Sequence, residues 1–332
     1  MKRILYGFVF LVTVFFLSYF FLFPGFDGSP DDADVQKEKK ISPGVKFDEY
    51  SIEEELGKKP QENELKEWVK ARALNYEMQP ENASIDPVTD GIIPGRLGEK
   101  VDLEKTMEAI YNAGEDELVK PVLKEIKPDK SIDDLTPGPI YNGNPKENKI
   151  SFICNVAWGS EYIVDLLDVL DDHQVKISFF LEGRWARNNP EKVRKIYQNG
   201  HEIGNHAYSH YNMSTIDRDL IKEEIEKAND TIKNILDLQV ELFGPPAGDF
   251  DQRVIEEVDE LGMYTILWSI DTVDWMEPGV ENMVNKVLEK AHPGGFILMH
   301  PTEDTVKAID NIIHQLKDDS FNIVPISKQL EV

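Results

Sequence analysis

The stretch GHEIGNHAYSH at residues 200–210 carries the sharpest chemical signal in this chain. His206 and His210 stand four residues apart, so their imidazoles can face one metal ion if the backbone makes a helical turn there. Such a pair is a weak signal by itself, because helix surfaces and caps supply it by chance. The segments around the pair therefore have to decide what it means.

Short apolar runs alternate with helical patterns on both sides of this stretch. The helical pattern is clearest at residues 221–235, where isoleucines and an alanine recur by four and three. The strand-like runs lie at residues 149–154, 175–181, 240–243, 264–270, 295–299 and 322–326. This alternation predicts a mostly parallel α/β fold, in which helices surround a barrel or a doubly wound sheet.

Several motifs stand in a fixed order along the same region. They are Ser178-Phe179-Phe180, the His206 and His210 segment, Phe243-Gly244-Pro245-Pro246-Ala247-Gly248, Asp271-Thr272-Val273-Asp274-Trp275 and Leu298-Met299-His300-Pro301. The ordered set resembles the NodB-homology domain of the polysaccharide deacetylases, the family 4 carbohydrate esterases, over residues 149–332, and looks closest to their sporulation-associated bacterial branch. The resemblance implies a distorted (β/α) barrel that removes N-acetyl groups from chitin oligomers or peptidoglycan.

The resemblance also implies roles for individual residues. His206 and His210 match two histidines that hold a divalent metal, for which we expect zinc. His300 matches the general acid that protonates the departing amine, and a carboxylate from Asp271 or, by preference, Asp274 is expected to tune that acid. A metal polarises the amide carbonyl, while an imidazole delivers the proton that the leaving nitrogen needs. The residues expected to shape the acetyl pocket are Trp275, Leu298, Pro245 and Pro301.

The first and third family motifs depart from the pattern. The usual Thr-Phe-Asp-Asp-Gly falls on residues 153–157, so Asn155 occupies the general-base position and Val156 the metal-aspartate position. Gly244 stands where family members have an arginine that orients the base. An amide has no basic lone pair near pH 7, and valine offers no ligand atom. A replacement base could come from Glu161, Glu182 or Glu202, and the sequence does not choose among them.

Two functions are considered at this level, and the family resemblance makes the first the expected one. The first is a hydrolase acting on carbon–nitrogen bonds, which removes acetyl groups from cell-wall glycans with a rearranged base. The second is an inactive glycan-binding or scaffold protein at the cell surface. A plainer alternative treats Asp271 and Asp274 as strand-end caps, Trp275 as core and His300 as a hydrogen-bonding residue at a strand end. The joint occurrence of the ordered motifs argues against that alternative.

The N-terminal residues and the overall charge bound the protein's surroundings. The net charge of −26 repels a nucleic acid, so nucleic-acid binding is discarded. Residues 4–23 form an uncharged run long enough to cross a bilayer, and Lys2 and Arg3 precede it. We therefore expect a single-pass cell-membrane anchor with the C-terminal domains outside the cytoplasm; the alternative is a secreted protein.

The chain is expected to divide into five segments. Residues 1–26 carry the anchor, 27–60 an acidic disordered linker, 61–136 a small α+β module, 137–148 a second linker and 149–332 the deacetylase-like domain. The module resembles a peptidoglycan-binding domain of wall-associated enzymes, so peptidoglycan or another acetylated glycan is the expected partner. The single cysteine, Cys154, lies among apolar neighbours and is interpreted as core packing.

Overall fold

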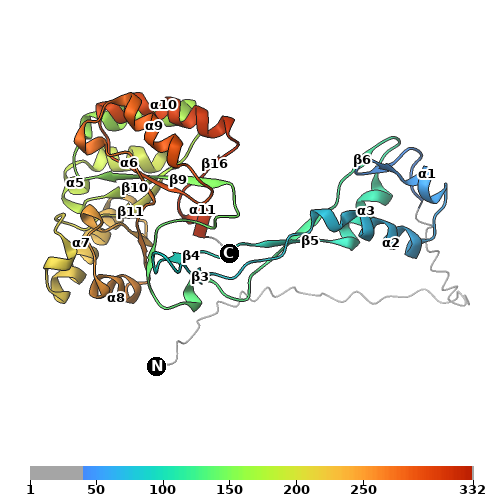
Figure 1. Ribbon diagram of the computed structural model, residues 1–332, viewed down its shortest axis with the longest axis horizontal. Coiled ribbons are helices and arrows are strands. Elements are labelled where there is room, and N and C mark those ends of the chain that lie inside the picture. The colour runs from blue at the N-terminus through green and yellow to red at the C-terminus, as the bar shows by residue number, and fades with distance from the viewer. Residues whose placement is uncertain (1–39, 331–332) are drawn as a thin grey trace, which may run out of the picture. The chain divides into compact units, whose positions relative to one another are not determined.

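The computed structural model describes residues 40–330. Its C-terminal part is built on a curled parallel sheet, consistent with a distorted (β/α) barrel (Figure 1). Every neighbouring pair in this sheet is parallel. The strands, in spatial order, are β14 (Ile270–Asp271), β15 (Phe296–Met299), β9 (Lys149–Val156), β10 (Ser178–Leu181), β11 (Glu202–Asn205), β12 (Leu242–Phe243), β13 (Tyr264–Ile266) and β8 (Pro139–Ile140), with β16 (Asn322–Ile323) paired to the start of β9.

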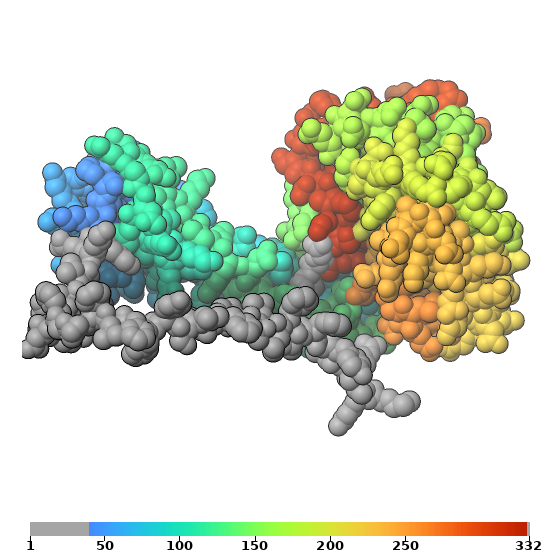
Figure 2. Space-filling model, turned by 180° about the vertical axis from the view of Figure 1, so that it is seen from behind, coloured from blue at the N-terminus to red at the C-terminus, as the bar shows by residue number. Residues whose placement is uncertain are grey.

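Helices follow most of these strands and cover the sheet, as a parallel sheet requires. Figure 2 shows one side of this part of the protein, where residues coloured from yellow-green to red lie at the surface. The helices are α4 (Ile163–Asp172), α5 (Gly183–Asn188), α6 (Pro190–Gln198), α7 (Arg218–Leu236), α8 (Gln252–Glu260), α9 (Val280–Lys290), α10 (Glu303–Asp318) and α11 (Ser327–Leu330). Short 3₁₀ turns lie between them: η3 (Ser160–Tyr162), η4 (Met213–Thr215), η5 (Pro246–Gly248) and η6 (Asp274–Met276).

The central strand β9 is buried on both faces. Its side chains alternate: Phe152, Cys154 and Val156 join the core between the sheet and the helices, whereas Ile153 joins the core inside the curl of the sheet. The Phe180 side chain from β10 belongs to that inner core as well. Burial on both faces explains why β9 reads as a continuous apolar run. Cys154 is fully buried, which confirms that it packs in the core.

The N-terminal part has a separate core, formed around Phe47, Leu65, Trp68 and Ile110. Asp102 caps the helix that carries Ile110, since its carboxylate accepts the backbone N–H of Lys105 at 3.1 Å. The elements are β1 (Lys46–Phe47), β2 (Tyr50–Ser51), α1 (Ile52–Leu56), α2 (Glu62–Ala73), η1 (Leu74–Tyr76), β3 (Ser84–Ile85), β4 (Ile92–Ile93), β5 (Gly98–Val101), α3 (Leu103–Asn112), β6 (Leu118–Val119), β7 (Leu123–Ile126) and η2 (Ile132–Asp134).

The structure differs from the expected segment limits at two points. Strands β1 and β2 and helix α1 fall inside the range expected to be a linker, and Phe47 and Ile52 are buried there. Strand β8 falls inside the second expected linker and pairs with β13. Strands of two residues and a helix of five residues are too short to show a clear periodicity in the sequence.

The expected location in the membrane needs correction. Among residues 40–330, no helix is long and apolar enough to span a bilayer. The run at residues 4–23, on which that expectation rested, lies outside the described residues. We therefore do not retain a single-pass membrane location or a membrane partner for this chain.

Candidate functional site

The predicted site residues meet at one edge of the curled sheet. His206 directly follows β11, Asn155 lies near the end of β9, and His300 directly follows β15. Asp274 opens the turn η6, shortly after β14 ends. These are the carboxyl ends of parallel strands, where the connecting loops of an α/β fold build most ligand sites.

His206 and His210 lie close together, although not on a helix. The ring centroids are 5.1 Å apart and the rings are nearly perpendicular, at 72°. The segment is a loop rather than a helical turn, and Ala207 and His210 have left-handed backbones with φ of 57° and 58°. The Nδ1 of His206 lies 2.6 Å from the carbonyl oxygen of Gly244. Because a carbonyl only accepts, Nδ1 carries the proton and the lone pair stays on Nε2.

Buried polar side chains hold this histidine loop in its conformation. Asn205 is completely buried; its Nδ2 donates to the carbonyl of Ile225 at 2.8 Å, and its Oδ1 accepts the N–H of Ala207 at 2.7 Å. Glu224 on α7 accepts the backbone N–H of Ser209 at 2.6 Å and the Ser209 hydroxyl at 2.8 Å. These contacts offset the cost of the left-handed residues, which is of order 1–3 kcal/mol for each.

Both rings are held in the neutral form that a ligand or acceptor role requires. Burial, with smaller contributions from the nearby His210 and His300, lowers the pKa of His206 to about 3. Partial desolvation and His300 also lower the pKa of His210. The influence of His300 on both pKa values indicates that its ring lies near the other two imidazoles.

His300 is paired with Asp274 rather than with Asp271. The His300 Nδ1 lies 2.8 Å from Oδ1 of Asp274, and the His300 backbone N–H donates to Oδ2 at 2.5 Å. Thr305 donates its hydroxyl to the same carboxylate at 2.9 Å. Asp271 instead accepts the N–H of Val273, whose φ of 60° is strained for a β-branched residue. The carboxylate therefore orients the ring and leaves Nε2 available to the cleft.

The opposite half of the expected catalytic centre is missing. Asn155 is 5% exposed, and its Oδ1 has no hydrogen-bond partner among the described residues. Val156 is fully buried in the core that faces the helices. Gly244 lies against the Phe180 ring, so a Cβ added there would stand 2.9 Å from Cδ1 of Phe180.

A divalent metal does not find three protein ligands here. Among residues 40–330, no group of three His, Cys, Asp or Glu side chains is placed to hold an ion. His206 and His210 supply two nitrogens, and Val156 supplies no donor where the family has a carboxylate. Structural and catalytic zinc sites usually have three or four protein ligands, so the residues present do not fit such a site.

The acids considered as a replacement base are engaged elsewhere or lie away from the cleft. Glu182 caps α5 by accepting the N–H of Trp185 at 2.5 Å. Glu202 lies at the start of β11, at the other end of the strand from His206. Glu161 is exposed in η3. None of the three contacts the histidines through a hydrogen bond among the described residues.

The residues expected to shape the acetyl pocket divide into exposed and buried ones. Trp275 is 57% exposed, next to Asp274. Leu298 is 2% exposed and packs in the inner core beneath His300. Pro245 and Pro301 are also buried, each in a loop that follows a strand. Only Trp275 offers a large free surface to a ligand.

Sequence reasoning missed one side chain of the site, Trp158. Its ring is stacked on the His300 ring with a centroid separation of 5.7 Å and an angle of 10°. The available signal was its place, three residues after Asn155 and just beyond the end of a buried strand. A tryptophan in a loop after a buried strand is free to contact a ligand.

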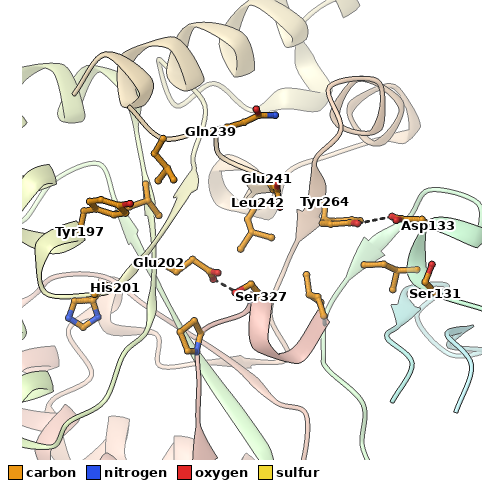
Figure 3. A pocket seen from close by; sticks show the side chains of 16 residues that line it. Ser131, Asp133, Tyr197, His201, Glu202, Gln239, Glu241, Leu242, Tyr264 and Ser327 are labelled. Carbon is orange, nitrogen blue, oxygen red and sulfur yellow. Dashed lines mark hydrogen bonds between the residues drawn. The ribbon is translucent and has the colours of Figure 1, made fainter. Parts of the chain in front are cut away.

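A separate cavity of about 650 Å³ lies elsewhere in the fold (Figure 3). Tyr197, Glu202 and Tyr264 line it, and the Tyr264 hydroxyl donates to Asp133 at 2.7 Å. Its strand residues come from the amino-terminal ends of β11, β12 and β13, opposite to the three imidazoles. The candidate site is therefore identified by its side chains and not by the volume of a cavity.

Comparisons with known proteins indicate the polysaccharide deacetylase family, as the ordered motifs do. The family model of the polysaccharide deacetylases matches residues 142–266. The protein YlxY of Bacillus subtilis, described as uncharacterized, is 39% identical over 80% of this chain and 83% of its own length. The peptidoglycan-N-acetylmuramic acid deacetylase PdaA of the same organism is 31% identical over 56% of this chain and 73% of its own.

A solved structure is similar over most of the described chain. BA3943 of Bacillus anthracis, described as a CE4 family pseudoenzyme, is 36% identical, has a TM-score of 0.73 and covers 80% of this chain and 95% of its own. A mutant of BA3943 is described as having restored enzymatic activity. None of these descriptions mentions sporulation, so that assignment stays a prediction. The chain belongs to the polysaccharide deacetylase family, and its first and third motifs are degenerate.

Proposed function

We propose that this chain binds acetamido groups of peptidoglycan or a related glycan in the cleft of His206, His210 and His300, and holds them without the usual hydrolysis. The observation that carries the proposal is the state of the first motif. Asn155 is a buried amide with an unpaired oxygen, and Val156 is part of the core. The cleft keeps groups that recognise an amide and lacks those that activate water.

The chemistry explains why the loss falls on hydrolysis. Attack on an amide needs a base to take a proton from water, and the Asn155 side chain is not basic near pH 7. The unpaired Oδ1 of Asn155 can still accept a hydrogen bond from an acetamide N–H, which would satisfy a buried polar atom. Binding is thereby favoured by the same substitution that removes the base.

A metal ion cannot be given its family role on these residues. His206 and His210 alone would leave an ion with at least two positions for water, and a carboxylate that completes the site is absent. Metal affinity falls when a ligand is lost, so we build no step of the function on zinc.

The second candidate is an active hydrolase with a base recruited from elsewhere. The intact pair of His300 and Asp274 favours it, because that pair is the machinery that protonates a leaving amine. The peptidoglycan deacetylases among the similar proteins also favour it. Under this second function, the deacetylase-like domain is an enzyme with a distorted barrel of the NodB type, and it hydrolyses carbon–nitrogen bonds.

The N-terminal module adds a second contact with the wall in our proposal. Its sequence, within residues 61–136, resembles a peptidoglycan-binding domain, and Leu65, Trp68 and Ile110 of this range share a core with Phe47. Two linked sites on one polymer raise the overall affinity without any new contact.

One experiment separates the two candidates. Full-length protein and its His206→Ala variant are mixed with purified peptidoglycan, and both the retained protein and the released acetate are measured with zinc, cobalt or manganese. Retention of the wild-type protein without acetate release supports the binding function. Acetate release that His206→Ala abolishes supports the hydrolase. Failure of the wild-type protein to sediment with peptidoglycan would refute the binding proposal.

A further inference from the structure

An exposed tryptophan lies beside the predicted acid. Trp158 is 46% exposed, and its ring is nearly parallel to the His300 ring, at 10°, with the ring centroids 5.7 Å apart. At this separation the two rings are offset, so a large part of the indole surface is free for a ligand.

The segment that carries Trp158 is fixed rather than loose. Gly159 has a φ of +73°, and a Cβ at this position would stand 2.0 Å from the carbonyl oxygen of Pro301. Only glycine allows this close approach to the loop after His300. The Ser160 hydroxyl accepts the Trp185 indole N–H at 2.8 Å, which ties the next residue to α5. The indole is thus held in place before any ligand arrives, and a preorganised side chain loses little entropy on binding.

Two further exposed aromatic side chains directly follow residues of the site in the sequence. In the described part of the deacetylase-like domain, Tyr211 follows His210 directly and is 43% exposed, and Trp275 follows Asp274 directly. Tyr197, at 42% exposure, lies at the other cavity instead. Flat, neutral aromatic faces suit the apolar face of a neutral ring. A sugar ring has such a face, whereas its hydroxyls can reach polar groups at the edges.

We infer that the outer face of the Trp158 indole is a stacking platform for a pyranose ring of the bound glycan. The inference rests on the proposed function, and it places on Trp158 the sugar unit next to the one whose acetamide meets His300. It also explains how the cleft can bind without a three-ligand metal site: apolar contact area replaces the coordination that Val156 no longer supports. Tryptophan anchors of this kind commonly dominate binding energy.

The test measures binding of an N-acetylglucosamine hexasaccharide to the full chain by isothermal titration calorimetry. Trp158→Ala and Trp158→Leu should each weaken binding at least about tenfold, because both remove the flat ring. Trp158→Phe should keep the affinity within about threefold, since a ring remains. Tyr197→Ala is the matched control: it removes an equally exposed aromatic side chain at the other cavity and should leave the affinity unchanged.

The outcomes distinguish this inference from the proposed function. Wild-type affinity in folded Trp158→Ala or Trp158→Leu protein overturns the platform and leaves the binding function standing. If Trp158→Ala fails to fold, as shown by its melting temperature, Trp158→Leu decides the question, because it retains apolar volume without a planar face. Absence of binding by the wild-type protein overturns both.

Discussion

Aspartate at position 156 should create a metal site and reduce the stability of the metal-free protein. Val156 is fully buried as the last residue of β9, beside Leu181 of β10, whose carbonyl accepts the backbone N–H of His206. Burying a valine contributes about 1.5–3 kcal/mol, and an unpaired polar group in its place costs about 1–3 kcal/mol. We therefore expect Val156→Asp to lower the free energy of unfolding by about 3–5 kcal/mol without metal. Zinc at about one hundred times its dissociation constant should restore about 2.7 kcal/mol.

The assay is urea unfolding with and without zinc, followed by circular dichroism. Val156→Asn is the matched control, since it has nearly the same size and polarity but is a poor zinc ligand. Adding His206→Ala to Val156→Asp should abolish the stabilisation by zinc. If zinc stabilises the aspartate and asparagine variants equally, the reasoning that the site lacks a carboxylate ligand at this position is refuted.

Three further predictions concern stability. Burial lowers the pKa of His201 from 6.5 to about 4, so the unfolded chain binds a proton that the folded protein refuses, and stability falls as the pH drops from 6.5 towards 4. Between pH 7 and pH 5 this residue should lower the free energy of unfolding by about 2 kcal/mol. In urea titrations, the stability of His201→Gln should therefore depend less steeply on pH than that of the wild-type protein. An equal slope for the two proteins would contradict this role of His201. Asp274→Ala leaves three hydrogen-bond donors without an acceptor and should lower the free energy of unfolding by about 3–5 kcal/mol. Asp271→Ala loses one hydrogen bond and should lower it by about 1 kcal/mol. Equal losses in chemical denaturation would show that the buried pair of Asp274 and His300 does not contribute more than the hydrogen bond of Asp271. Glu224→Ala should cost about 3 kcal/mol and speed amide exchange at residues 206–210, whereas the exposed Glu223→Ala should do neither; unchanged exchange would mean that the loop does not depend on this carboxylate.

The sequence indicated the longer strands of the sheet because burial on two faces leaves a visible apolar run. The expected run at 149–154 corresponds to β9 (Lys149–Val156), and the run at 295–299 to β15 (Phe296–Met299). Strands β8 and β1 were not foreseen, since two residues carry no period. Their pairing depends on partners that are distant in sequence, and propensity does not encode such partners.

The candidate site could be predicted where a motif fixes residue type and order. His206 and His210 lie with their ring centroids 5.1 Å apart, and Asp274 contacts His300. The segment makes no helical turn, and left-handed Ala207 lies between the two imidazoles instead. The stacking of Trp158 could not be predicted, since the contact joins loops after two different strands.

The most direct measurement of the central claim follows the acetyl groups of a glycan that the wild-type protein has bound. An N-acetylglucosamine oligomer is incubated with the protein and zinc, and its binding is quantified. The molecular mass of the recovered oligomer, determined by mass spectrometry, gives the number of acetyl groups that remain. The account predicts saturable binding and an oligomer that retains every acetyl group. Progressive loss of acetyl groups that His300→Ala abolishes would contradict it.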